Sequence, residues 1–111
     1  MIIAMIETWS DGRLLVSCTG HAGYAEHGKD IVCSAVSALV QTLAFSLDEV
    51  THENVKYSLT GGNASIEACS LSNDGKTLLR SFLVGMKAIE SAYPDNLTVD
   101  TRLFQWEQKG S

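Results

Sequence analysis

A stretch without any charged side chain, residues 31–47, limits the possible folds of this chain more than any other feature. Apolar residues recur along it at the spacing of a helix, at positions 32, 36, 39, 40, 43 and 47, and again at 50. Serine, glutamine and threonine interrupt the stretch, and Asp48 and Glu49 follow it, which suits a buried helix better than a membrane span. Because this helix is apolar nearly all round, it must be covered on more than one side, within the chain or at a subunit contact.

Two predicted hairpins flank that helix. Residues 2–9 alternate, with Ile2, Ala4 and Ile6 on one face, and residues 13–19 return as a second strand after a turn signal at Asp11 and Gly12. Beyond the helix, apolar residues alternate at positions 55, 57 and 59 and again at 64, 66 and 68, on either side of a turn at residues 61–63. Each pair of strands therefore predicts an antiparallel hairpin.

The rest of the chain predicts one more helix and one more strand. Ser72 begins a capping sequence, an apolar stripe follows at positions 78, 79, 82, 86, 89 and 93, and Pro94 stands at the end. Residues 97–101 indicate a last strand, which Phe104 and Trp106 would extend. The order is ββαββαβ, an α+β fold with a mostly antiparallel or mixed sheet packed with two helices. With 111 residues, one domain over residues 1–111 is expected.

Charge and cysteine content narrow the class of function. Eight basic and thirteen acidic side chains give a net charge of −5, which argues against direct nucleic-acid binding because such binding rests on lysine and arginine. No basic segment precedes the apolar residues at the N-terminus, so no secretory signal is expected. Three cysteines cannot all pair, and reduced thiols in a cytoplasmic protein are the expectation. The glycines at 20, 23 and 28 fit neither familiar phosphate-loop spacing.

The segment between the second strand and the first helix carries the most chemistry. His21 stands at the predicted strand end, and Cys33 falls in the first turn of the helix if Asp30 is its N-cap. The positive end of the helix dipole and the unpaired N–H groups there favour a thiolate. A histidine base beside such a thiol is a working arrangement for covalent catalysis, so the sequence predicts a small cysteine peptidase.

Neighbouring residues are predicted to support that pair. The Asp30 carboxylate would bond an N–H of the first turn and fix where the helix begins, and so where the sulfur points. Ser37 lies one turn after Cys33 on the same face, where its hydroxyl would hold His21 or donate to a reacting carbonyl oxygen. The loop with Gly23, Tyr24 and Gly28 would close over an extended peptide.

Other interpretations of the same residues stay open. A Cys and a His at this separation are more often a buried inert thiol and an unrelated histidine, and Cys18 and Cys69 are assigned that ordinary role. Cys18, His21, His27 and Cys33 are a possible zinc set, but their spacings match no common structural zinc pattern. A redox switch at Cys33 lacks an evident resolving partner. We therefore predict no metal and no cofactor.

The residues GHA at 20–22 and GKDIVCSAVS at 28–37 resemble the signature of the ribosomal-processing cysteine protease family, Prp. The similarity covers nearly the whole chain, including the ββαββα order and the turn at residues 61–62. The resemblance implies Cys33 as the nucleophile and His21 as the general base, with Gly20, Asp30 and Ser37 at supporting positions.

The same resemblance implies a biological role. Members of the family are small cytoplasmic proteases, usually homodimeric, that remove an N-terminal extension from a large-subunit ribosomal protein, number twenty-seven of that subunit. Their substrates present aromatic residues just before the cut, which implies an apolar pocket, with Tyr24 and Phe45 as loose candidates for its wall. The alternative is a non-catalytic, ribosome-associated module that binds a basic ribosomal-protein tail in an acidic groove.

Overall fold

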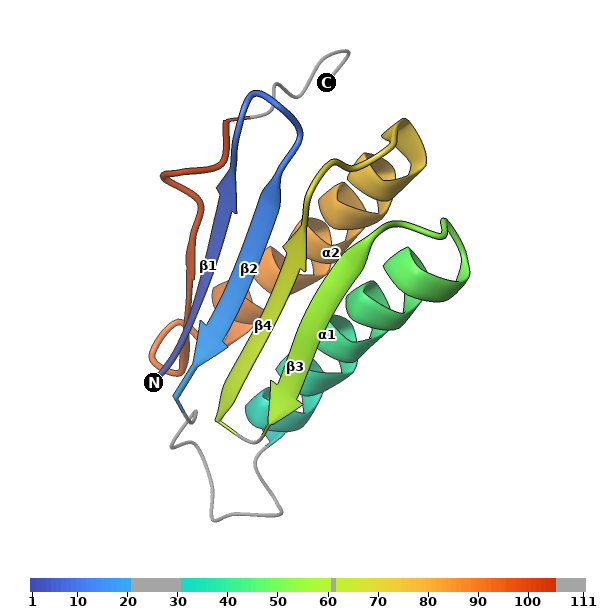
Figure 1. The fold of residues 1–111 in the computed structure, drawn as a ribbon. Coiled ribbons are helices and arrows are strands. Elements are labelled where there is room, and N and C mark those ends of the chain that lie inside the picture. The colour runs from blue at the N-terminus through green and yellow to red at the C-terminus, as the bar shows by residue number, and fades with distance from the viewer. Residues whose placement is uncertain (21–30, 61, 106–111) are drawn as a thin grey trace.

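The computed structural model of the protein describes residues 1–20, 31–60 and 62–105. Within them the elements follow the predicted order (Figure 1): β1 (Ile2–Thr8), β2 (Leu14–Thr19), α1 (Ile31–Glu49), β3 (Val55–Thr60), β4 (Asn63–Ala68), α2 (Asn73–Ala92) and β5 (Leu97–Asp100). The predicted ββαββαβ order and the α+β class are confirmed.

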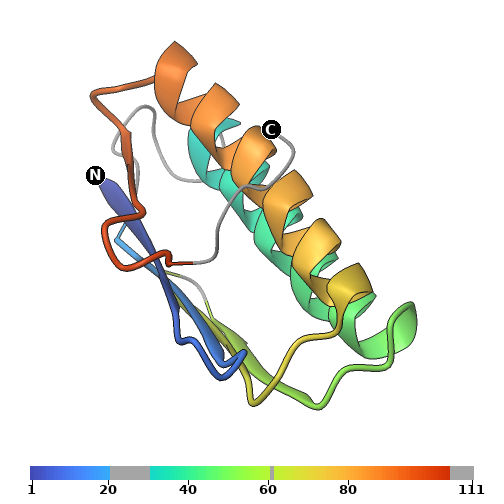
Figure 2. The same cartoon turned by 90° about the horizontal axis from the view of Figure 1, so that it is seen from above.

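The strands form a five-stranded sheet in the order β3-β4-β2-β1-β5. Neighbouring strands are antiparallel except for β1 and β5, which are parallel, so the sheet is mixed. Figure 2 shows α1 and α2 lying side by side over one face of the sheet. The core therefore lies between that face and the two helices.

Alternation decides which side of each strand is buried. In β1, Ile2, Ala4 and Ile6 are almost inaccessible to solvent, whereas Ile3 is 49% exposed, as the sequence pattern predicts. Figure 1 shows the tight connection between β1 and β2 at the predicted turn. There Gly12 has a φ of +96°, a conformation that L side chains rarely adopt.

The helices complete the core from the other side. α1 directs six residues inward: Val32, Val36, Val40, Leu43, Ala44 and Leu47. α2 begins at the predicted cap, because the Ser72 hydroxyl oxygen accepts a hydrogen bond from the N–H of Gly75 at 3.1 Å. By length and composition α1 would also qualify as a membrane span, but here its buried side chains pack into the core, while Ile31 and Phe45 are exposed.

The end of the sheet differs from the prediction. β5 stops at Asp100, whose carboxylate accepts hydrogen bonds from the backbone N–H and the guanidinium of Arg102. The chain then turns, and the N–H of Phe104 donates to the carbonyl of Thr101 at 3.0 Å. The expectation that Phe104 extends the strand is therefore wrong, because the local Asp100–Arg102 contact favours a turn; Trp106 lies outside the described residues.

The segment after this turn still bonds to the end of β1, beyond the last residue of β5. The N–H of Thr8 donates to the carbonyl of Leu103 at 3.1 Å, and the Thr8 hydroxyl accepts the N–H of Gln105 at 2.7 Å. Thr8 is 1% exposed, so this hydroxyl has its partner inside the fold.

Candidate active site

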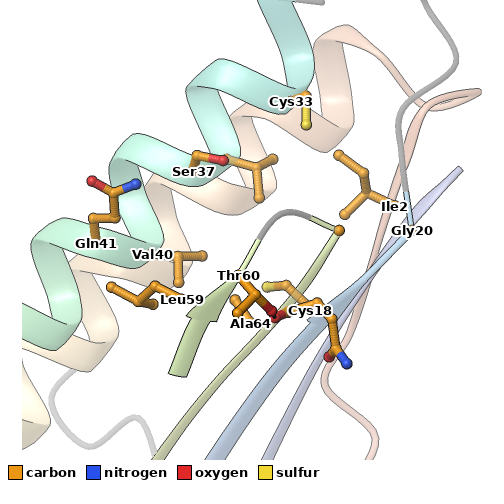
Figure 3. Close-up of a pocket in the computed structure, with 13 residues that line it drawn as sticks. Ile2, Cys18, Gly20, Cys33, Ser37, Val40, Gln41, Leu59, Thr60 and Ala64 are labelled. Carbon is orange, nitrogen blue, oxygen red and sulfur yellow. Dashed lines mark hydrogen bonds between the residues drawn. The ribbon is translucent and has the colours of Figure 1, made fainter. Parts of the chain in front are cut away.

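A cleft of about 200 Å³ opens between the first half of α1 and three strand ends, the end of β2, the end of β3 and the start of β4. Figure 3 shows Cys33, Ser37 and Gln41 on successive turns of α1, with the Cys33 sulfur pointing toward the strand ends that carry Gly20 and Thr60. The helix wall consists of five residues: Cys33, Val36, Ser37, Val40 and Gln41. This cleft brings together residues that are far apart in the sequence, because the β3–β4 hairpin folds back beside the end of β2.

Cys33 is the third residue of α1 as the structure gives it, and it is partly exposed at the cleft wall. The predicted place in the first helical turn is therefore confirmed. Residues 31–34, which form the first turn of α1, include no acidic residue. Negative charge on the sulfur or on a reacting carbonyl oxygen is stabilised at this end of a helix.

Ser37 and Gln41 continue the face of α1 that begins with Cys33. Both are exposed, and neither side chain makes a hydrogen bond to another described residue. Their hydroxyl and amide groups are therefore available to a molecule in the cleft. Ser37 was expected from the sequence, whereas Gln41 was missed, although the spacing of four from Ser37 is a readable signal.

The floor of the cleft is apolar. Ile2, Leu59 and Ala64 contribute to it, together with Cys18 from β2. Cys18 is 6% exposed, and burial raises the pKa of its thiol to about 11. The prediction that Cys18 is a small buried hydrophobe is confirmed. Its place in the floor was not predictable, because it depends on how β2 pairs with β4.

The third cysteine lies at the other end of the sheet. Cys69 directly follows β4, whose first residue, Asn63, lies at the cleft. It is exposed, so the prediction that it is a buried thiol is wrong: Cys69 follows the alternation of β4 on the side where Glu67 is also exposed. Cys33 is therefore the cysteine that combines a helix start with exposure to the cleft.

Gly20 connects the strand end to the opposite hairpin. Its N–H donates to the carbonyl of Gly62 at 3.0 Å, which holds the β3–β4 turn against the end of β2. Gly20 has a φ of +97°, and an added Cβ would meet the carbonyl oxygen of Met1. Only glycine fits both constraints, which gives a physical reason for glycine at this position.

The remaining predicted site residues, His21, Gly23, Tyr24, Gly28 and Asp30, lie outside the described residues. Phe45, a candidate for the pocket wall, does not line this cleft; it contacts Tyr57 farther along α1.

The metal and redox alternatives depend partly on residues outside the described ranges. Over residues 1–20, 31–60 and 62–105, no three His, Cys, Asp or Glu side chains are grouped so that they could hold a metal ion. Two members of the possible zinc set, His21 and His27, lie outside those ranges. The cysteines at 18, 33 and 69 are not joined in a disulfide.

Comparisons with known proteins agree with this geometry. The family model described as cysteine protease Prp matches residues 1–98. A ribosomal processing cysteine protease Prp from Staphylococcus aureus is 30% identical over 104 residues, covering 90% of this chain and 98% of the relative. The protein of the same name from Bacillus subtilis is 31% identical over 112 residues, covering 93% and 99%.

Solved structures show the same fold. The essential ribosomal processing protease Prp from S. aureus, in complex with a covalently linked product peptide, superimposes with a TM-score of 0.81 at 27% identity, covering 90% of this chain and 98% of that one. SMU.848 from Streptococcus mutans gives a TM-score of 0.70 at 29% identity, covering 90% and 92%. The match extends over nearly the whole length of these chains, and so the protein described here is a cysteine peptidase that belongs to the cysteine protease Prp family.

Proposed function

We propose that this peptidase removes the N-terminal extension of a large-subunit ribosomal protein, number twenty-seven, with Cys33 as nucleophile and His21 as general base. The position of Cys33 carries the proposal, since it combines the first turn of a helix with the wall of a cleft. The names of the relatives support ribosomal processing as the setting. A covalently linked product peptide in a relative is what a thiol nucleophile would leave behind.

The first half of the reaction forms an acyl-enzyme. His21 takes the proton of the Cys33 thiol, and the thiolate sulfur attacks the scissile carbonyl carbon. The oxygen of that carbonyl becomes negative and accepts hydrogen bonds from N–H groups at the start of α1 and from the Ser37 hydroxyl. The C–N bond then breaks, and the leaving amine takes the proton from the His21 imidazolium.

The second half releases the product. A water molecule gives a proton to His21 and attacks the thioester carbonyl; the C–S bond breaks, and the thiol is restored. Asp30 has a positional role as the helix cap, and the loop with Gly23, Tyr24 and Gly28 covers the bound peptide. Gly20 supports the site by fixing the strand end from which that loop begins.

The cleft also suits this substrate. Its apolar floor offers a place for the aromatic side chains that precede the cut, and it is lined by Ile2, Leu59 and Ala64. The net charge of −5 suits a basic ribosomal-protein tail. We further propose that the enzyme is cytoplasmic and acts as a homodimer, a single domain in each protomer.

The test is mass spectrometry of the extended ribosomal protein after incubation with the enzyme, with Cys33→Ala and Cys69→Ala in parallel. One cut near the end of the extension, absent with Cys33→Ala and present with Cys69→Ala, is the expected result. Turnover by Cys33→Ala would remove Cys33 from the nucleophile role. Retention of the substrate without any cut by the unmodified protein would favour a binding module instead.

A further inference from the structure

β3 is an edge strand, and its outer side has no neighbour among the described strands. Its last residues, Leu59 and Thr60, line the same cleft as Cys33. Figure 1 shows α1 running alongside β3, with the start of the helix and the end of the strand at the same end of the molecule. The free edge of the sheet is therefore continuous with the candidate active site.

Along each strand, the backbone N–H and C=O groups of successive residues point alternately to the two neighbouring strands. This alternation, followed across the sheet, decides which residues of β3 direct their backbone groups outward. The N–H of Ile2 points toward the β5 side, where it donates to Asn96, and the N–H of Gly20 points from β2 toward the β3–β4 turn. Even-numbered residues of β2 therefore bond β4, and odd-numbered residues of β4 bond β3. It follows that Ser58 bonds Ser65, while the backbone groups of the neighbouring odd-numbered residues point outward.

These outward groups belong to Val55, Tyr57 and Leu59, which alternate along the edge with the paired residues. An exposed row of this kind is a template for an added strand. Its side chains face the helix layer: Leu59 lines the cleft, and the Tyr57 ring stands edge-on to Phe45 of α1, with centroids 5.7 Å apart.

α1 supplies a platform beneath that edge. Cys33, Ser37, Gln41 and Phe45 follow one another at intervals of four along the helix, and Ser37, Gln41 and Phe45 are exposed. The end of the platform away from Cys33 is acidic, with Asp48 accepting a hydrogen bond from the Tyr57 hydroxyl at 3.4 Å.

We propose that the substrate peptide binds as an added strand on the outer edge of β3, with main-chain hydrogen bonds to Tyr57 and Leu59. This inference rests on the proposed function, since the scissile bond must reach Cys33. Alternate side chains of the peptide point down onto the α1 platform, and the one nearest the cut enters the apolar floor of the cleft. Basic peptide residues distant from the cut lie near Asp48 and Glu49.

A peptide fits this edge better than a second copy of the chain does. The edge ends in the cleft wall, so a strand bound there is led directly to the reacting thiol. Pairing by backbone groups also holds a peptide extended, the form in which a peptidase can reach its scissile carbonyl. Edge-to-edge pairing of two copies would instead cover the groups that the substrate needs.

A scan of N-methylated substrates tests the pairing with the unmodified enzyme. Each residue of a synthetic extension peptide, apart from the scissile bond, is N-methylated in turn, and kcat/KM is measured. The expected result is a loss of roughly five- to tenfold at every second residue over the paired segment, with little effect between. Losses without this period would overturn the inference. Failure to cut the unmethylated peptide would instead refute the proposed function.

Two variants give a matched test from the enzyme side. Proline is tolerated on an edge strand where the N–H faces solvent, so Tyr57→Pro removes the outward donor and Tyr57→Ala removes the ring alone. We expect KM to be roughly five- to tenfold higher for Tyr57→Pro than for Tyr57→Ala at similar kcat. Equal KM values in two variants with the same melting temperature would contradict the pairing.

Amide exchange in Cys33→Ala gives a reading independent of turnover. On adding the peptide, the N–H groups of Tyr57 and Leu59 should exchange more slowly, while that of Ser58, already paired within the sheet, should not change. Unchanged exchange at all three while other resonances report binding would overturn the inference. A second result would also overturn it: slow exchange of the Tyr57 and Leu59 N–H groups without peptide, becoming slower as the protein concentration rises. That result would assign the edge to a second copy of the chain.

Discussion

Gly20 and Gly12 offer a comparison that separates backbone strain from close contact. Both have nearly the same φ, +97° and +96°, so replacing either by alanine forces an L side chain into the same disfavoured region. Their surroundings differ. A Cβ at Gly12 would lie 3.1 Å from the hydroxyl oxygen of Ser70, a side-chain atom that can move, whereas at Gly20 it would meet the backbone carbonyl of Met1.

The size of the effect follows from these contacts. The backbone conformation alone costs about 1–3 kcal/mol in either variant. Gly20→Ala must also displace Met1, next to the N–H of Ile2 that bonds Asn96, and such overpacking adds about 1–3 kcal/mol. We therefore expect Gly20→Ala to be more destabilising than Gly12→Ala by about 1–3 kcal/mol.

Urea denaturation of both variants measures this difference, with m-values checked for a common unfolding transition. Activity supplies a second reading. Gly20→Ala should lower kcat/KM even in the absence of urea, where the variant is still folded, because the Gly20–Gly62 hydrogen bond positions the cleft. Gly12→Ala should leave kcat/KM unchanged. Equal losses of stability would refute the argument that the Met1 carbonyl, and not φ alone, demands glycine at position 20.

Three further results are expected. Ser72→Ala should lower stability by about 1 kcal/mol in thermal unfolding, because α2 loses its N-cap. The hydrogen bonds from Arg102 lower the pKa of Asp100 from 3.8 to about 2, so their contribution is present above pH 3.8 and is lost as pH falls through about 2. Arg102→Gln should return the pKa of Asp100, followed by NMR, toward 3.8; an unmoved pKa would contradict the assignment. Alkylation monitored by mass spectrometry should modify exposed Cys69 well before buried Cys18, whose pKa is about 11; equal rates would show that the core opens readily.

The elements were predictable because their signals are local. Alternation and the turn glycine define the first hairpin, and the cap at Ser72 defines the start of α2. The strand order was not predictable in this way, because the pairing of β1 with β5 joins residues from opposite ends of the chain. The error at Phe104 has a local cause: apolar residues after position 100 matched a strand pattern, but the Asp100–Arg102 contact turns the backbone there.

The residues of the candidate site also differ in whether the sequence could predict them. Cys33 and Ser37 were predictable, because a helix start and a one-turn spacing are properties of a single segment. Gly20 was identified through the family resemblance, and its physical reason, the nearby Met1 carbonyl, becomes visible only in three dimensions. Cys18 and Leu59 belong to the cleft through pairings of β4 with β2 and β3. No periodicity within one segment could have placed them beside Cys33.

The parallel pairing of β1 with β5 has a consequence for how the enzyme becomes active. Few residues separate the two strands of the β1–β2 hairpin and of the β3–β4 hairpin, so these hairpins can form early, since short loops close quickly. β1 gains its second neighbour only when residues near position 97 are in place, and Ile2 at the start of β1 is part of the cleft floor. The contact order of this fold is therefore raised at the end of the sheet that holds the cleft. We therefore expect a growing chain to complete its cleft only after the residues near position 97 have been synthesised.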